Sequence, residues 1–185
     1  MIFRETKISG AFLIEPEPRV DQRGSFARTW CQEEYQARGL RDRVVQINTS
    51  GSIYKGTLRG MHFQRHPHHE AKTVSCTKGA IYDVVLDLRP ESPSYLQWDR
   101  AELTAASRRM IYIPEGCAHG FQTLTDDSEV LYFMSAFYSP EHSSGVRFDD
   151  PSFRIEWPLR VSVISEVDRA WPDFKPVAAT LDLVR

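Results

Sequence analysis

Three side chains with the chemistry to move a proton, His62, Lys72 and His119, lie in segments rich in glycine and in strand-forming residues. An imidazole accepts a proton near neutral pH, and a cation or hydrogen-bond donor stabilises the oxyanion that forms when a carbon next to a carbonyl loses its proton. Either Lys72 or His119 could stabilise that oxyanion, and Tyr132 is a candidate acid on the opposite face. We therefore predict a proton-transfer site with His62 as its base.

The spacing of these residues resembles that of small jelly-roll barrels of the cupin type. Such barrels carry two sequence boxes, G-x5-H-x-H-x3,4-E-x6-G and P-x-G-x2-H. Gly56-x5-His62-x-Gln64 and Lys72-x6-Gly79 follow the first box, and the segment PEGCAH at residues 114–119 matches the second. Together the two boxes predict that His62 and His119 lie on two strands that face one cavity.

Two positions of the first box carry the wrong chemistry for a metal. Gln64 stands where a histidine ligand is expected, and Lys72 puts an ammonium where a carboxylate is expected. The two histidines of the boxes fall short of the three protein ligands that are usual at catalytic zinc and non-haem iron sites. The cluster HPHH at residues 66–69 is a rival source of ligands, although its proline predicts a solvated turn. We predict no bound metal, and a metal-dependent cupin is kept as an alternative.

The elements that must hold these side chains are predicted to be short strands. Runs of β-branched and aromatic residues cover residues 12–14, 44–48, 72–76, 81–88, 109–113 and 129–134, with turns at 78–79, 114–116 and 126–127. Residues 32–38 predict two turns of helix that end at Gly39. Many short strands indicate an all-β sandwich or barrel with a few short helices, and the tail from Pro151 onward is expected to pack over it.

Length and composition exclude several classes of protein. A chain of 185 residues favours a single domain over residues 1–185. No apolar run approaches the roughly 20 residues that span a bilayer, and the first ten residues lack the apolar run of a secretory signal, so we expect no membrane partner and a cytoplasmic location. The net charge of −2 argues against a nucleic-acid partner. Three scattered cysteines without a CxxC pair are expected to be free thiols.

Longer stretches resemble the cupin-like nucleotide-sugar epimerases typified by dTDP-4-dehydrorhamnose 3,5-epimerase. They occur in order between Asp21 and Asp168 and include DQRGSF at 21–26, QIN at 46–48, LRGMHFQ at 58–64, GAIYDV at 79–84, PEGCAHGF at 114–121 and YSPEH at 138–142. The resemblance implies a jelly-roll barrel, a homodimer that exchanges N-terminal strands, and a reaction without a cofactor. It also implies a substrate, a nucleotide-diphosphate-linked 4-keto-6-deoxy sugar, that is inverted at C3, at C5 or at both carbons.

The same resemblance assigns roles to residues. It implies that His62 is the base, that Asp168 orients it, that Tyr132 is the acid and that Lys72 stabilises the enolate. The residues that it places against the substrate are Arg23, Phe26, Gln46, Asn48, Arg59, His119, Tyr138 and Glu141. Of these, Phe26 and Tyr138 would flank the nucleotide base, and the guanidinium groups of Arg23 and Arg59 suit a diphosphate. Arg23 is expected to serve the site of the neighbouring subunit.

Two departures from the family pattern bear on specificity. Arg28 stands where the family often has an acidic residue, and Phe133 stands where a lysine often follows the acid tyrosine. The nucleotide, the sugar and the number of inverted centres are therefore left open, and an epimerase that inverts only C3 is one alternative. A sugar-binding cupin without catalysis is another.

Overall fold

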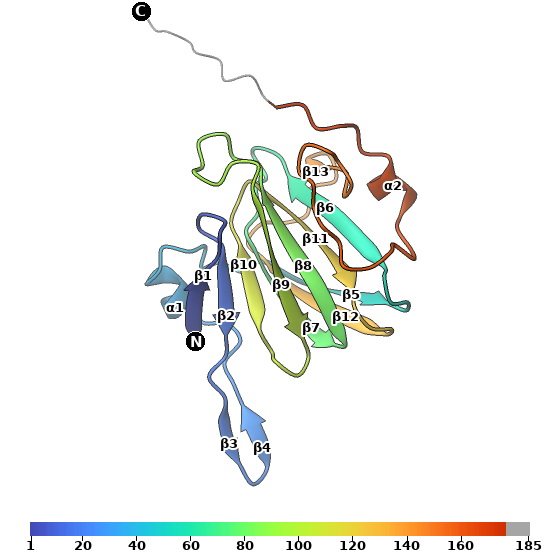
Figure 1. Ribbon diagram of the computed structural model, residues 1–185. Coiled ribbons are helices and arrows are strands. Elements are labelled where there is room, and N and C mark those ends of the chain that lie inside the picture. Colours follow the sequence, from blue (N-terminus) through green and yellow to red (C-terminus); the bar gives the residue numbers. More distant parts are fainter. Residues whose placement is uncertain (177–185) are drawn as a thin grey trace, which may run out of the picture.

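The computed structural model describes residues 1–176, and two antiparallel sheets form most of it (Figure 1). The six-stranded sheet has the order β1-β2-β10-β7-β12-β5, from β1 (Ile2–Glu5), β2 (Phe12–Glu15), β10 (Met110–Ile113), β7 (Lys72–Lys78), β12 (Ser128–Met134) and β5 (Gln46–Ser52). The five-stranded sheet has the order β13-β6-β11-β8-β9, from β13 (Ser143–Gly145), β6 (Leu58–Gln64), β11 (Cys117–Thr123), β8 (Ala80–Asp87) and β9 (Trp98–Thr104).

The chain passes back and forth between the two sheets, which is the path of a jelly roll. The predicted all-β jelly-roll class is therefore confirmed. Only two short helices are present in the described part, α1 (Gln32–Gln36) and α2 (Glu166–Arg169), and within residues 1–176 no helix is long and apolar enough to cross a membrane. The domain prediction of 1–185 stays a prediction, and its last residues, 177–185, lie outside the described part of the chain.

The core between the sheets comes from side chains at alternating strand positions. Because successive strand residues point to opposite faces, each strand contributes every second residue. Val74 and Cys76 of β7, Ile81 and Val85 of β8 and Phe121 of β11 belong to this buried cluster. Tyr132 of β12 packs against it. Strand residues on the same face as these core residues therefore point into the space between the two sheets.

The tail covers the outer face of the five-stranded sheet, as predicted. Tyr82 and Leu86 of β8 share a buried cluster with Phe153, and Trp157 and Phe174 of the tail pack against the same cluster. The Tyr82 hydroxyl also donates a hydrogen bond to the carbonyl of Glu156 (3.0 Å). This packing carries the chain to α2, which lies beside β6 (Figure 1).

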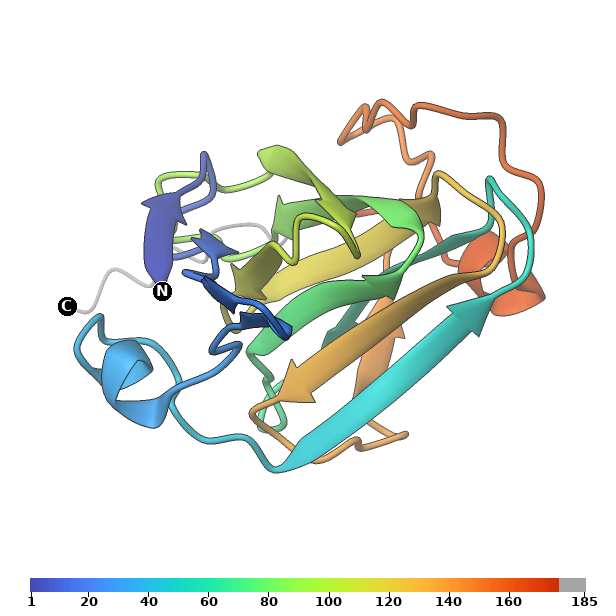
Figure 2. The same cartoon turned by 90° about the horizontal axis from the view of Figure 1, so that it is seen from below.

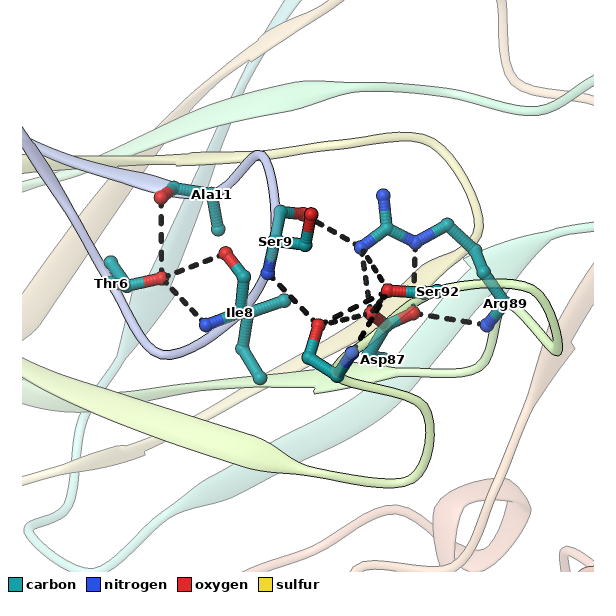
Figure 3. A network of polar contacts seen from close by, with 8 residues as sticks. Thr6, Ile8, Ser9, Ala11, Asp87, Arg89 and Ser92 are labelled. Atoms are coloured by element: carbon teal, nitrogen blue, oxygen red, sulfur yellow. Dashed lines mark hydrogen bonds and ion pairs between the residues drawn. The ribbon is translucent and has the colours of Figure 1, made fainter.

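A buried polar network fixes the loop between β1 and β2 against the loop that follows β8 (Figure 3). The Asp87 carboxylate accepts hydrogen bonds from Arg89, Ser92 and Ser94. Arg89 also donates to the carbonyl of Ser9 (2.7 Å), and the Ser9 backbone N–H donates to Ser94 (2.9 Å). Burial by itself would raise the pKa of Asp87, but these donors outweigh it and lower that pKa to about 2.

A two-stranded ribbon, β3 (Arg19–Asp21) paired with β4 (Gly24–Phe26), projects from the barrel (Figure 1). Every residue of both strands is exposed, including Val20 (76%) and Phe26 (74%). Strand β5 is an edge strand of the six-stranded sheet, in which its only neighbour among the described residues is β12 (Figure 2). We call the ribbon of residues 19–26 the arm.

Candidate active site

A cavity of about 590 Å³ lies between the two sheets at one end of the barrel. Seven of the twelve predicted site residues line it: Asn48, Arg59, His62, Lys72, His119, Tyr132 and Asp168. They come from both sheets and from α2, so distant parts of the chain meet there. The prediction that His62 and His119 face one cavity is confirmed, and the two residues are direct partners in the register of β6 and β11.

His62 and Asp168 form a hydrogen-bonded pair. Nε2 of His62 lies 2.6 Å from Oδ1 of Asp168, and the His62 side chain is 45% exposed while that of Asp168 is 7% exposed. A carboxylate only accepts hydrogen bonds, so Nε2–H is the donor and the other ring nitrogen is left free to take a proton. This is the arrangement of a base with an orienting carboxylate.

Short-range contacts fix Asp168 in place. Ser165 caps α2 by accepting a hydrogen bond from the Asp168 backbone N–H (3.0 Å), and the second carboxylate oxygen of Asp168 accepts one from the Gly60 backbone N–H (3.3 Å). Burial alone would favour the protonated acid, but the hydrogen bonds from His62 and Gly60 keep the pKa of Asp168 below its ordinary value. Asp168 is therefore held as a carboxylate.

Two glycines allow β6 and β11 to approach closely beside His62. A Cβ on Gly60 would lie 2.5 Å from the Cα of Gly120, and Gly60 has φ +141°, which side chains rarely adopt. The register between β6 and β11 shifts at this point, between His119 and Phe121. The glycines thus set the local strand geometry that aligns His62 with His119 and brings Gly60 N–H to Asp168.

A second histidine–aspartate pair is formed by His119, which lines the cavity, and Asp83, which is buried behind it. Nε2 of the buried His119 lies 2.8 Å from Oδ2 of Asp83, and Oδ1 of Asp83 has no hydrogen-bond partner among the described residues. Burial raises the pKa of Asp83, which the nearby His119 and Lys72 partly oppose. We did not predict Asp83 from the sequence. The available signal was a charged residue between Ile81 and Val85, at an inward position of a strand.

Tyr132 faces the cavity from the opposite sheet. Its ring is edge-on to that of His119 with centroids 6.2 Å apart. Burial and then the charge of Asp83 raise the pKa of Tyr132 well above its ordinary value, and a hydrogen bond with Ser50 partly opposes this. The phenol is therefore kept in its protonated form, as a proton donor must be.

Lys72 points into the cavity from the middle of the six-stranded sheet. Its ammonium lies 2.8 Å from Oε1 of Glu70, and the two side chains are 6% and 8% exposed. Glu70 was not predicted from the sequence. Lys72 thus brings a positive charge to the cavity wall, with a buried carboxylate beside it.

Apart from His119, the predicted substrate-contacting residues divide into four groups. Arg59 lies at the cavity wall, where it donates to the carbonyl of Gly51 (2.9 Å). Gln46, outside the cavity lining, donates to the Asn48 side chain (3.1 Å) and accepts from the Tyr138 backbone N–H (3.2 Å), so these residues form one rim. Glu141, farther along the exposed loop after Tyr138, does not line the cavity.

The fourth group, Arg23 and Phe26, does not meet the cavity of its own chain. Both residues lie on the arm and line a separate hollow there. Arg23 pairs with the exposed Asp21 of the same arm, with 2.6 Å between the guanidinium and the carboxylate. Their predicted contact with a substrate would therefore have to occur in another subunit.

The two departures from the family pattern lie away from the cavity lining. Arg28 pairs with Glu34 of α1 (3.0 Å), and Glu34 also binds the amino terminus of Met1 (2.9 Å). Phe133 points to the face opposite Tyr132 and lines a small hollow outside the catalytic cavity, together with Tyr35. Neither residue touches the cavity in this subunit.

The histidine cluster at 66–69 forms the turn that was predicted after β6. His66 and His68 are exposed, and the ring of His68 packs against that of His142 with centroids 4.2 Å apart. Within residues 1–176 no three His, Cys, Asp or Glu side chains are grouped as metal ligands. The predicted absence of a metal stays a prediction.

Known proteins resemble this chain along most of its length. The sequence profile described as dTDP-4-dehydrorhamnose 3,5-epimerase matches residues 5–176. A dTDP-4-dehydrorhamnose 3,5-epimerase of Methanothermobacter thermautotrophicus is 44% identical over 172 residues, which is 91% of this chain and 92% of the relative. The crystal structure of the Bacillus anthracis enzyme with TDP and PPi bound has a TM-score of 0.90 and 38% identity, covering 94% of this chain and 99% of the other.

A third relative carries a different activity in its name. The dTDP-4-dehydrorhamnose 3-epimerase of Streptomyces niveus is 38% identical over 170 residues, which is 91% of this chain and 82% of the relative. The profile match and these identities extend over nearly the whole described chain, including both sheets and α2. The chain therefore belongs to the dTDP-4-dehydrorhamnose 3,5-epimerase family and is an isomerase of the epimerase type.

Proposed function

We propose that this protein epimerises C3 and C5 of a nucleotide-linked 4-keto-6-deoxy sugar of the dTDP-4-dehydro-6-deoxyglucose type, without a cofactor. The observation that carries the proposal is the His62–Asp168 pair facing Tyr132 across one cavity. A base on one side and an acid on the other can invert a carbon whose hydrogen is made acidic by a neighbouring ketone.

The reaction proceeds in two proton transfers at each centre. His62 takes the hydrogen from the carbon next to the C4 ketone, and Asp168 stabilises the imidazolium that results. The electrons of the broken C–H bond move into an enolate with its negative charge on the ketone oxygen. Tyr132 then donates its proton to the opposite face of the same carbon, which inverts the configuration.

Cationic and polar groups around the cavity stabilise the enolate. Lys72 places its ammonium at the cavity wall, and His119 adds a ring whose orientation is fixed by Asp83. Preorganised charges and donors of this kind stabilise a developing oxyanion without having to rearrange during the reaction. The residues that the sequence left as alternatives for this role, Lys72 and His119, both line the cavity.

The nucleotide diphosphate is proposed to lie along the rim. Arg59 suits the diphosphate, and Gln46, Asn48, Tyr138 and Glu141 are proposed to hold the nucleoside. The relative from Bacillus anthracis was crystallised with TDP and PPi, which supports a thymidine nucleotide. Relatives named for dTDP-4-dehydrorhamnose support the same class of sugar.

A homodimer is part of this proposal. The arm exposes Val20 and Phe26, and β5 leaves a free edge beside the rim residues Gln46 and Asn48. An arm added by a second subunit would cover apolar surface and bring its Arg23 and Phe26 to that rim. Sedimentation at micromolar concentration should give twice the chain mass, and a monomer would refute the dimer.

A cytoplasmic location is also proposed, and cell fractionation with an activity assay tests it.

Solvent deuterium incorporation tests the function. The purified protein, without added metal, is incubated in D2O with a panel of dTDP- and GDP-linked 4-keto-6-deoxy sugars. We expect deuterium at C3 and C5 of the dTDP-linked sugar, and loss of this exchange in His62→Ala. No exchange with any member of the panel would refute the proposal and would favour a sugar-binding protein without catalysis. Elemental analysis showing stoichiometric iron, zinc or manganese would favour a metal-dependent cupin.

A C3-only epimerase is the second candidate. It is supported by the relative from Streptomyces niveus, whose name specifies a 3-epimerase. The same deuterium experiment separates the candidates, because a C3-only enzyme would leave C5 in its original configuration. Product stereochemistry at C5 therefore decides between them.

A further inference from the structure

We propose that Glu70 is a positioning residue that keeps Lys72 in its ammonium form and directs it into the cavity. This rests on the proposed function, in which Lys72 stabilises the enolate. Oε1 of Glu70 lies 2.8 Å from Nζ of Lys72, and the side chains are 8% and 6% exposed. Both side chains are therefore largely buried.

The fold holds Lys72 at an inward position, where only 6% of its side chain is exposed, at the cavity wall. Lys72 opens β7, a central strand, where it lies opposite Ile113 of β10 and Met134 of β12. Glu70 precedes it by two residues on the chain that enters β7. Residues two apart on an extended chain point to the same side, so the carboxylate comes to lie beside the ammonium.

An ammonium taken out of water favours the neutral amine unless a negative charge compensates it. The other titratable or charged groups that line the cavity with Lys72 are Arg59, His62, His119, Tyr132 and Asp168. Asp83 on β8 and Cys117 on β11 lie buried within reach of its charge. Asp83 is hydrogen-bonded to His119, and Asp168 to His62. Among the described residues Glu70 alone forms an ion pair with Lys72.

The consequence for catalysis is a wider working range of pH. The Glu70 carboxylate, 2.8 Å from Nζ of Lys72, favours the charged form of the lysine, which is the form that stabilises the enolate. Without the carboxylate, the ammonium would lose its proton at a lower pH. The enolate would then lose its cationic partner in the range where the base is available.

The test compares Glu70→Gln with the parent in the deuterium-exchange assay between pH 5.5 and 9. Glutamine keeps the size and an acceptor oxygen but removes the charge. We expect the alkaline limb to move to lower pH, and for each pH unit of displacement the rate at a fixed pH on that limb should fall about tenfold. Glu115→Gln, which removes the partner of the exposed Arg41, is the matched control and should leave the profile unchanged.

Two outcomes would overturn the inference. A Glu70→Gln profile that coincides with the parent would show that the charge has no role. A fall by the same factor at every pH would show a purely structural role. Glu70→Asp, which restores the charge, should recover the alkaline limb. If the parent itself exchanges no hydrogen, the proposed function fails instead.

A measurement independent of activity separates these cases. The chain has five lysines, so ¹³C-lysine NMR gives few signals, and Lys72→Arg identifies that of Lys72. We expect the Lys72 signal of Glu70→Gln to titrate at lower pH than in the parent. The other four lysine signals report whether the variant is folded. An unchanged Lys72 titration in a folded variant would refute the inference whatever the substrate is.

Discussion

Replacing Asp168 by asparagine removes the orienting carboxylate while conserving its shape. In the parent, Nε2–H of His62 donates to Oδ1 over 2.6 Å, and the second oxygen accepts from Gly60 N–H. The asparagine side chain can still accept one of these hydrogen bonds, so the fold should persist. Its amide group can instead donate to Nε2, which would force the proton of His62 onto the nitrogen that has to act as the base.

The size of the effect follows from the role of the pair. A positioned general base contributes about 10²–10⁴-fold to a rate, and an asparagine that selects the wrong tautomer removes most of that contribution. We therefore expect exchange to slow by about 10²–10⁴-fold, which corresponds to about 3 to 5 kcal/mol of activation free energy. The melting temperature should change little by comparison.

The assay measures initial rates of solvent deuterium incorporation, with circular dichroism as a check of folding. Glu166→Gln is the matched control, because Glu166 is an exposed carboxylate in the same short helix. It should behave like the parent. If Asp168→Asn kept a rate within about threefold of the parent, His62 would not depend on this carboxylate, and the pair could not be the base of the reaction.

Three further predictions concern the fold and the assembly. The folded protein lowers the pKa of Asp87 from an ordinary 3.8 to about 2, which contributes about 2 kcal/mol to the free energy of unfolding. This contribution is present above pH 4 and is lost as pH falls through 2. In urea titrations Asp87→Asn should therefore be less stable than the parent at pH 7 but not at pH 2. Gly60→Ala should lower the free energy of unfolding by about 1–3 kcal/mol, because its Cβ would collide with Gly120. Gly51→Ala is the control, because a Cβ at Gly51 has no neighbour within 4 Å in the described part of the chain, and it should not lower this free energy. Equal effects of the two substitutions would refute the claim that Gly60 is needed for the close approach of β6 and β11. Mixing inactive His62→Ala with the arm variant Phe26→Ala should give more activity than either protein alone if each arm serves the partner's site, and simple additivity would contradict the arm exchange.

The strands could be predicted where strand-forming residues gather. The runs at 72–76, 81–88 and 129–134 correspond to β7, β8 and β12, because all three are rich in β-branched and aromatic residues. β8 is buried on both faces, between the core and the tail, and is a nearly continuous apolar run. The helix predicted at 32–38 ends two residues early, at Gln36, and the tail follows its expected path over the sheet. Strand β9 (Trp98–Thr104) was not predicted, since charged residues interrupt its pattern.

The site was predictable to the extent that its residues stand in sequence boxes. His62 and His119 follow from the spacing of those boxes. Asp168 follows only from family resemblance, because no local pattern reveals that a residue 106 positions away lies beside His62. Asp83 and Glu70 escaped prediction, since a buried charge is recognised as such only when its partner is known to be in reach.

The most direct test of the account separates proton removal from inversion in Tyr132→Phe. This variant keeps His62 and Asp168 but lacks the acid on the opposite sheet. When the reaction is run in D2O and the sugar is analysed for deuterium and for configuration at C3 and C5, we expect deuterium to enter with the original configuration retained and inversion strongly reduced. Inversion at the rate of the parent would contradict the claim that His62 and Tyr132 act on opposite faces of one carbon.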